Sequence, residues 1–426
     1  MLAEEYASLL GMPGLFDRTT FVPHPIWYTP TEEKVAKAYG NDPRRGGVVV
    51  EEIAESLTKP LSEAEVNPQE KPVPEVPRLL EPDTEENLLA LFNENGWVID
   101  GLPIVLPTEE RVAEMLTGTS HAPDEEFTIR AAYESYTFTV EKAAANAVMV
   151  GATPEMFPLL LCLAANGAGG ISTSTQSFAA YTIVNGPIAK EIGMNDDIGA
   201  LGPFNQANSV IGRYRNFISR NLGGGAIPWK NHWGGVGNSL NYNNVTFAEN
   251  EDALPEGWDP LHVQMGFEPE DSVVTVASGH GIWHIWNTTS SPVFGEQILQ
   301  SLVRNYPDNG FFAAGALLLV DPDTAFILYT AEGFESKEEI SQYGWENTWV
   351  SLEDYWGYNY PQNMLYAVER KIEPHYSRAT LPQDTLIHFF DSPERIQVVV
   401  VGGGTNPFSQ MGAARSFKSY SVDEWR

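Results

Sequence analysis

Six prolines in one acidic stretch, at positions 60, 68, 72, 74, 77 and 82, constrain how this chain can fold. Proline lacks a backbone N–H and fixes φ, so a segment with prolines this dense sustains neither a helix interior nor a central strand. Residues 59–87 are therefore predicted to form a semi-rigid, extended linker. The linker separates a small N-terminal arm, residues 1–58, from a main domain, residues 88–426.

The arm is expected to be a small α/β unit. EEYASLLGM, residues 4–12, reads as a helix, and RTTFVPHPIWYT, residues 18–29, as a strand or extended segment. PTEEKVAKAYG, residues 30–40, is a second predicted helix, opened by Thr29 and Pro30, because proline is favoured in the first turn of a helix.

The main domain alternates predicted helices with apolar runs rich in β-branched residues. The helices are expected at 108–116, 139–151, 153–167 and 205–224, and the strands at 272–279, 315–321, 325–333 and 395–404. Continuous apolar strands are typical of a sheet covered on both faces. The pattern predicts an α/β fold, with a mixed sheet covered by helices and the small α/β arm in front of it.

The charge balance limits the partners of the chain. The formal net charge is −32, which disfavours nucleic acid and anionic membrane surfaces, because both require a positive face. The apolar run MFPLLLCLAA, from Met156, is far shorter than the roughly 20 residues that span a bilayer. The N-terminus lacks the basic region of a signal peptide. We therefore expect a cytoplasmic protein with no membrane or nucleic-acid partner.

The sequence contains one cysteine, Cys162. A single cysteine excludes an internal disulfide and a cysteine-based zinc site within these residues. Cys162 lies in an apolar helical run, so we expect a small buried side chain rather than a nucleophile.

The stretch NLGGGAIPWKNHWGGVGN, residues 221–238, combines glycines with tryptophans, a lysine and a histidine. A phosphate loop has glycines between a strand and the start of a helix, but here a helix precedes the glycines. No nucleotide cofactor is therefore expected. Glycine lets backbone approach a ligand closely, so the stretch is predicted to form one wall of a small-molecule pocket. It contributes His232 as a catalytic candidate and Trp229, Lys230 and Trp233 as substrate-binding candidates.

Two carboxylates follow this stretch. Glu249 and Glu251 flank Asn250, and alternation along a strand would direct both to the same face. With His262 close by, they could bind a divalent metal ion or act as acid and base, and all three are candidate catalytic residues. The alternative is a solvated acidic turn in an acidic protein.

A histidine pair follows the strand predicted at 272–279. His280 and His284 are four residues apart in SGHGIWHIWNTTSSP, and Trp283 lies between them. Loops at strand ends carry the sites of α/β proteins, so the histidines are candidate metal ligands and Trp283 a candidate substrate contact. The alternative is that both rings pack against tryptophans.

Two further residues complete the predicted substrate-binding set. Asn185 precedes a helix that starts with proline, so it could cap that helix or line a pocket. Arg213 lies off the apolar stripe of the helix predicted at 205–224.

Several blocks of the main domain resemble an uncharacterised bacterial family named for its UGSC motif, in which U is selenocysteine or cysteine. The blocks, in order, are NENGWVIDGLPIVLPTEERVAEML, TVEKAAANAVMVGATPEMFPLLLCL, IVNGPIAKEIGMN, ALGPFNQANSVIGR, FAENEDALPEGWDPLHVQMGF, LLLVDPDTAFILYTAEGFESKEEI and VVVVGGG. The resemblance covers residues 88 to about 410. It implies an enzyme whose chemistry uses a thiol or selenol.

The arm resembles the end of the Cys/Sec domain of that family, including its HP step, here His24 and Pro25. Neither UGSC nor CGSC occurs in the sequence, and the histidine-bearing block reads SGHGIWHIWN, which departs from the family. The resemblance therefore implies that a partner subunit carries the missing motif and that the arm docks against it. Alternatively, the chain uses its histidines and carboxylates and needs no thiol.

We expect from these observations a subunit of a heteromeric enzyme that acts on a small organic molecule, with redox or lyase-type chemistry shared with a Cys/Sec-bearing partner. One alternative is a self-contained, metal-dependent hydratase or hydrolase. The other is a non-catalytic scaffold subunit.

Overall fold

The structure is a computed structural model, and it describes residues 18–23, 31–67, 77–131, 134–171, 177–228, 231–285, 315–359, 368, 370–405 and 408–426. The chain divides into two compact units. Unit 1 comprises residues 1–82 and 361–365, and unit 2 comprises residues 83–360 and 366–426. The predicted helix at 4–12 lies outside the described residues.

Unit 1 contains three short helices among its described residues: α2 (Thr31–Ala38), α3 (Val49–Thr58) and α4 (Glu63–Val66). Helix α2 matches the helix predicted at 30–40. The guanidinium of Arg18 contacts the end of α3 and the segment that follows it. It donates hydrogen bonds to the carbonyls of Ser56, at 2.9 Å, and Lys59, at 2.8 Å, and forms an ion pair with Glu65.

Helix α4 lies in the segment that was predicted to be extended, so that prediction was wrong for residues 63–66. The reason is a capping box, in which the backbone N–H of Ser62 donates to Glu65 at 2.7 Å and the Ser62 side chain pairs with the same carboxylate. The box closes one helical turn in the space between two prolines.

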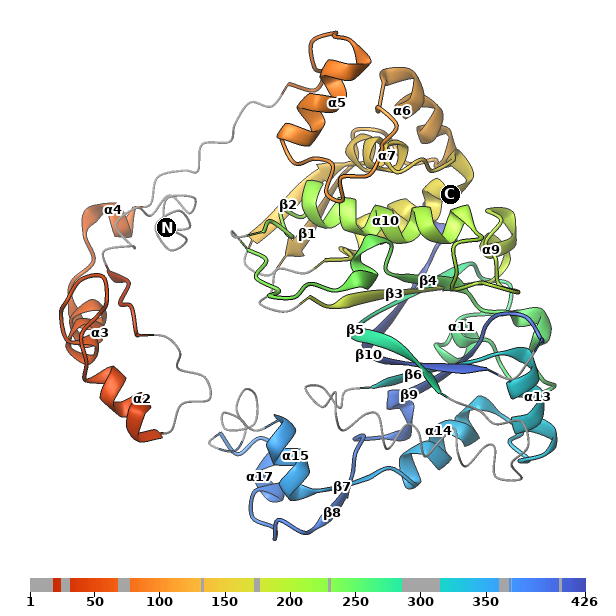
Figure 1. The fold of residues 1–426 in the computed structure, drawn as a ribbon. Coiled ribbons are helices and arrows are strands. Elements are labelled where there is room, and N and C mark those ends of the chain that lie inside the picture. The colour runs from red at the N-terminus through yellow and green to blue at the C-terminus, as the bar shows by residue number, and fades with distance from the viewer. Residues whose placement is uncertain are drawn as a thin grey trace. The chain divides into compact units, whose positions relative to one another are not determined.

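Unit 2 is built around a six-stranded mixed sheet of order β4-β3-β5-β10-β6-β9 (Figure 1). The strands are β3 (Ala179–Asn185), β4 (Val245–Ala248), β5 (Val273–Ile285), β6 (Ala316–Val320), β9 (Ile396–Val400) and β10 (Ser409–Ser421). The pairs β3–β4 and β6–β9 are parallel, and the pairs that involve β5 or β10 are antiparallel. With helices on its faces, the sheet confirms the predicted α/β fold.

The sheet curls so that the ends of its two outer strands meet. The N–H of Asn250, just after β4, donates to the carbonyl of Val400, the last residue of β9, at 2.8 Å. The side-chain amide of Asn250 donates to the carbonyl of Gly402 at 3.0 Å. The sheet is therefore fastened at this point, and one of its faces is turned inward.

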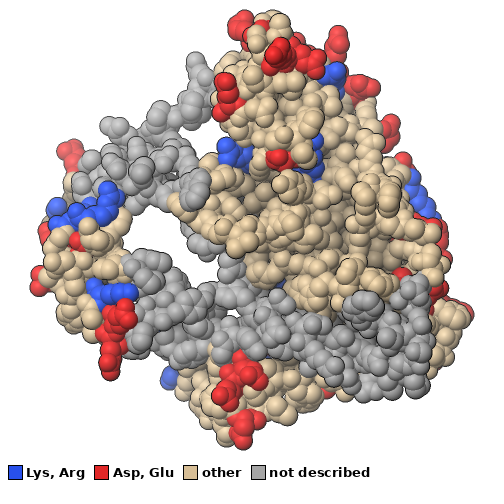
Figure 2. Space-filling view, in the orientation of Figure 1, with Lys and Arg blue, Asp and Glu red and all other residues tan. Residues whose placement is uncertain are grey.

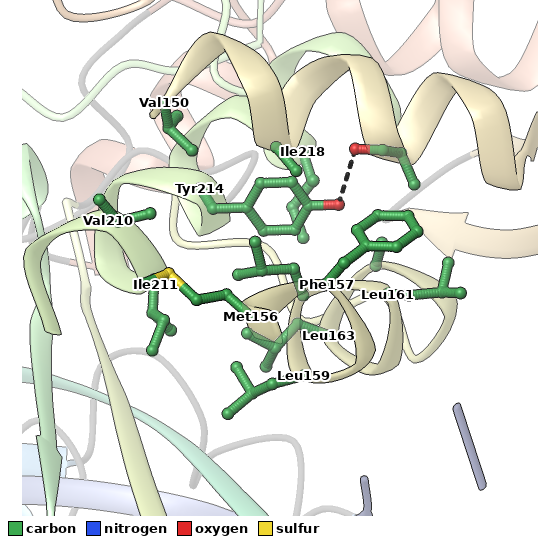
Figure 3. Close-up of a cluster of buried hydrophobic side chains, with 14 of the residues drawn as sticks. Val150, Met156, Phe157, Leu159, Leu161, Leu163, Val210, Ile211, Tyr214 and Ile218 are labelled. Atoms are coloured by element: carbon green, nitrogen blue, oxygen red, sulfur yellow. Dashed lines mark hydrogen bonds between the residues drawn. The ribbon is translucent and has the colours of Figure 1, made fainter. Parts of the chain in front are cut away.

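One face of the sheet is covered by a helical core made of α7 (Val140–Met149), α8 (Phe157–Ala165) and α10 (Gln206–Asn221). The predicted stripe of α10 is buried there, and its Tyr214 donates a hydrogen bond to the carbonyl of Ala143 at 3.3 Å (Figure 3). Arg215 of the same helix is also buried. Its guanidinium donates to the carbonyls of Ala168 and Tyr181, each at 2.7 Å, so it joins the helix to β3.

The opposite, inward face carries a second core. It takes side chains from all six strands, including Tyr181, Phe247, Ala277, Leu317 and Val399, together with Leu261 of α11 (Leu261–Gln264). Glycine is required where the strands pass closest to each other, since a Cβ at Gly279 would lie 1.6 Å from the carbonyl oxygen of Ala413.

The remaining elements surround the sheet (Figure 1). The helices are α5 (Glu85–Glu94), α6 (Glu109–Met115), α9 (Pro187–Glu191), α13 (Pro322–Thr330), α14 (Lys337–Glu346), α15 (Leu352–Asn359) and α17 (His375–Arg378). Two small antiparallel sheets pair β1 (Glu126–Ala131) with β2 (Glu134–Thr139) and β7 (Trp349–Ser351) with β8 (Leu386–His388).

The strand predicted at 325–333 is wrong, because these residues lie mostly in helix α13. The side chain of Asp321 caps this helix by accepting from the N–H of Thr324 at 2.7 Å, and Pro322 occupies the first turn. Cap and proline outweigh the strand preference of the aromatic and β-branched residues that follow. Residues 409–421, for which no strand was predicted, form β10, one of the two central strands.

No helix in the described part of the chain is long and apolar enough to cross a membrane. Acidic side chains gather over α5 and α6, as Figure 2 shows for one face. The first turn of each of these helices contains two glutamates, which suit the positive end of the helix dipole.

Candidate functional site

Three of the predicted site residues meet where β3 and β4 end. Asn185 is the last residue of β3 and is buried, and its side-chain amide donates to Glu249 at 2.8 Å and to Glu251 at 2.9 Å. Glu251 also accepts the N–H of Gly186 at 2.8 Å. The predicted N-cap role of Asn185 falls instead to Gly186, whose φ of 79° suits glycine.

Glu249 is the hub of this cluster. Its carboxylate is buried and accepts from the N–H groups of Leu261, at 2.7 Å, and Val400, at 3.4 Å, in addition to Asn185. It also pairs with the ammonium group of Lys337, the first residue of α14, which is buried as well. A carboxylate with this many donors is stable without water.

His262 lies beside the cluster on α11 and is fully buried. Its Nε2 lies 3.4 Å from the carbonyl oxygen of Pro269, and its Nδ1 lies 3.8 Å from Glu251. Nδ1 makes no hydrogen bond within the described residues. The structure thus brings together Asn185, Glu249, Glu251 and His262, and only the Glu251 side chain, 26% exposed, reaches solvent.

The arrangement of this cluster favours a structural role, in which it holds strands and helices together, over substrate binding. It joins the ends of β3, β4 and β9 to α11 and α14. Its hub carboxylate is closed off on every side, which leaves a substrate no access to it. We name these five side chains, Asn185, Glu249, Glu251, His262 and Lys337, the buried acidic cluster.

A hollow opens where β5, β6 and β9 end and where β4 and β10 begin. It has two lobes, of about 360 and 280 Å³, which share the lining residues Ala200, Leu201, Gly202 and Gln410. Carboxyl ends of strands are the usual ligand sites of α/β sheets, and this size suits a small organic molecule. We call it the strand-end hollow.

Polar groups line both lobes. Asp321 lies in the larger lobe and His284 in the smaller one. Burial raises the pKa of Asp321 above its ordinary value, although the N–H groups of Thr324 and Phe408 partly offset this. Asn208 and Thr246 line the smaller lobe, and each has a buried side-chain oxygen without a hydrogen-bond partner in the described structure.

The two predicted metal ligands do not converge. Both histidines lie on β5. Two residues of β5 lie between Gly279 and Ile282, whereas a single residue of β10 lies between their partners, Ala414 and Gly412, so β5 bulges here. This bulge separates their environments: the ring of His280 packs 4.9 Å from Phe178, whereas that of His284 packs 4.7 Å from Phe408. Among the described residues, no three His, Cys, Asp or Glu side chains are grouped so as to hold a metal ion.

His232 has an unexpected partner. Its Nε2 lies 3.1 Å from the hydroxyl oxygen of Ser177, two residues before β3. Both side chains are partly buried. No local pattern in the sequence predicts this contact between residues 55 positions apart.

The structure describes three of the other predicted substrate-binding residues. Arg213 forms an ion pair with Asp100, at 2.6 Å, and thereby ties α10 to the segment after α5. Trp233 is 42% exposed, and Trp283 is partly buried on β5. Trp229 and Lys230 lie outside the described residues.

Sequence reasoning missed Lys337, Asp321 and Ser177. Lys337 follows Ser336, which caps α14, so it reads as an ordinary first-turn residue. The signal for Asp321 was present, because DPDT after an apolar run is typical of a helix start at a strand end.

A scan against protein-family models, a search of curated proteins and a search of solved structures each found no match for this chain. The resemblance to the UGSC family therefore rests on the sequence blocks quoted above.

Proposed function

We propose that this chain is a subunit of a heteromeric enzyme that acts on a small organic molecule, and that its partner carries the reactive cysteine or selenocysteine. The chemistry is of a redox or lyase type and uses the thiol or selenol that the resemblance implies. The surface of unit 1 is the observation that carries the proposal.

Unit 1 exposes an unusual number of large apolar side chains for its size. Val35, Tyr39, Val50, Ile53, Leu57, Leu61, Val66, Leu79 and Leu80 are exposed, with Leu57 reaching 81%. Within the described part of the unit, Val49 is the one large apolar side chain that is buried. Contiguous exposed apolar residues mark interaction surfaces, and the described part of unit 1 exposes nine large apolar side chains against one that is buried.

The single cysteine supports a thiol from outside these residues. Cys162 is buried in α8, and burial raises the pKa of its thiol to about 12. A thiolate is the reactive form, so Cys162 stays protonated and inert near neutral pH. Thiol chemistry at this site therefore needs a sulfur or selenium atom from outside these residues.

The strand-end hollow supports the small-molecule substrate. Its lobes match the lower part of the size range of small-molecule pockets, and their walls combine apolar side chains with Asp321, Gln410 and His284. The chain segment that carries Glu249 and Glu251 reaches its wall, since the side-chain amide of Asn250, between them, donates to the carbonyl of Gly402 in the larger lobe.

The test is isolation of the tagged chain from its native cell, followed by labelling with iodoacetamide and mass spectrometry. We expect a second polypeptide in fixed stoichiometry with one fast-reacting Cys or Sec. A chain that turns over substrate by itself at full rate, with residues 1–82 removed, contradicts the proposal.

A further inference from the structure

Ser177 and His232 have the geometry of a nucleophile with its base. The hydroxyl oxygen and Nε2 are 3.1 Å apart, within the range in which histidine activates a serine. Both residues are of intermediate exposure, so the pair is not sealed from solvent although part of the surrounding water is excluded.

The backbone on both sides of the pair is fixed by side-chain amides. The Asn238 amide donates to the carbonyl of Ser177 at 3.2 Å, and that of Asn241 to the carbonyl of Phe178 at 2.8 Å. On the histidine side, the Asn231 amide donates to the carbonyl of Gly224 at 2.8 Å, and its oxygen accepts the N–H of Ile227 at 2.8 Å. A pair that must react needs such support, because small displacements are costly in catalysis.

Glycine at position 234 lets the chain pass directly beside the pair. A Cβ there would lie 2.0 Å from the Ser177 hydroxyl oxygen and 3.0 Å from Nε2 of His232. Gly235, the next residue, has nothing within 4 Å of its Cβ position. The two neighbouring glycines therefore provide a test substitution and its control.

We propose that Ser177 and His232 form a catalytic pair that accepts an acyl group from an ester or thioester of a small carboxylic acid. Nε2 of His232 takes the hydroxyl proton as the oxygen of Ser177 attacks the carbonyl carbon. The bond to the leaving oxygen or sulfur breaks, and the imidazolium returns the proton to that atom. Water, deprotonated by the same nitrogen, then releases the acid and restores the serine.

This activity goes beyond the proposed redox or lyase function and does not require the partner subunit. It can be measured on the full chain alone, with p-nitrophenyl acetate as substrate and a fluorophosphonate as label. We expect one label per chain, located at Ser177 by peptide mapping. Ser177→Ala should remove the label, and His232→Gln should slow labelling about 100-fold, the usual contribution of a general base.

Substitutions at Gly234 and Gly235 distinguish a chemical role of Ser177 and His232 from a structural one. Gly234→Ala should abolish labelling, whereas Gly235→Ala should leave it unchanged, with the fold of both checked by circular dichroism. If Gly234→Ala does not fold, Ser177→Cys serves in its place. Its thiol should react with iodoacetamide at least tenfold faster than in the double variant Ser177→Cys/His232→Gln, and Cys162 should not react in either.

The proposal is overturned if the native chain is labelled no faster than Ser177→Ala, if the label maps to another residue, or if the Ser177→Cys thiol reacts equally with and without His232. Each result would leave the pair as a contact that only holds the loop to β3.

Discussion

Glu249 and Lys337 form an ion pair from which water is fully excluded, 88 residues apart in the chain. The pair fastens the end of β4 to the start of α14, and the same carboxylate receives the backbone N–H of Val400 from β9. A buried charge is tolerated only when it is paired and hydrogen-bonded, and here both conditions hold. The curled sheet is thus fastened where its outer strands meet.

Breaking this pair should destabilise unit 2 strongly. Lys337→Met leaves the carboxylate with its three other donors, whereas Glu249→Leu leaves an ammonium and two backbone N–H groups without this acceptor, and the Asn185 amide with only Glu251. Loss of one partner of a buried pair costs about 3–5 kcal/mol, and Glu249→Leu should lie at the upper end. Urea unfolding followed by tryptophan fluorescence measures both.

The exposed pair of Lys190 and Asp252 is the matched control, because its side chains are 63% and 75% exposed. Lys190→Met should leave the unfolding midpoint nearly unchanged. Equal effects of Lys190→Met and Lys337→Met would contradict the assigned role of the buried pair.

The sequence predicted four of the five members of the buried acidic cluster, but not their roles. Glu249 and Glu251 were selected because alternation along a strand would direct both to one face, His262 because it lies close to them in sequence, and Asn185 because it precedes a helix that starts with proline. The expected mechanism, two carboxylates on one strand, is not the reason they meet. Strand β4 ends at Ala248, and Glu251 starts a short 3-10 turn (Glu251–Ala253) that returns it to Asn185.

The long-range partners could not be predicted, because they depend on sheet pairing. Lys337 and Ser177 carry no local pattern that points to Glu249 or His232. Strand β10 contains one glycine, four serines and a lysine, which favour a loop when read alone, and it is a strand because β5 and β6 supply hydrogen bonds on both sides. By contrast, the helix cap at Asp321 could be predicted from its local sequence.

Two histidines should make stability depend on pH in opposite directions. Burial, and then the guanidinium of Arg415, lower the pKa of His280 below its ordinary value. Burial alone would lower the pKa of His121, but its bonds to Glu125 and to the carbonyl of Glu424 outweigh burial and raise it.

The signs follow from proton binding. His280 binds fewer protons folded than unfolded, so its contribution is lost as the pH falls below about 6.5, the ordinary histidine value. The contribution of His121 is complete below that value and is lost as the pH rises through its raised pKa. Between pH 5.5 and 7.5, His280→Gln should therefore flatten the rise in unfolding free energy, and His121→Gln should steepen it. The same slope change in both variants would contradict these assignments.

Cys162 should not react with thiol reagents in the folded chain. Its pKa of about 12 and its burial both prevent attack on a disulfide reagent. Titration with DTNB at pH 8 should find no reactive thiol in native protein and one per chain in 6 M guanidinium chloride. Rapid reaction of the native chain would remove the argument that the reactive sulfur comes from a partner.

The exposed apolar residues of unit 1 should matter for partner binding and not for folding. Leu57 and Leu61 are 81% and 63% exposed, so Leu57→Ser and Leu61→Ser remove little buried surface and should leave the thermal unfolding of the chain unchanged. If this surface docks on a subunit, burying both leucines there contributes several kcal/mol, and the double variant should weaken binding about 100-fold or more. Phe326→Ser is the matched control, since Phe326 lies in unit 2 and is 63% exposed. Isothermal titration of the isolated partner with each variant measures the affinity. Equal affinity of the partner for the native chain and for the double leucine variant would place the interface elsewhere.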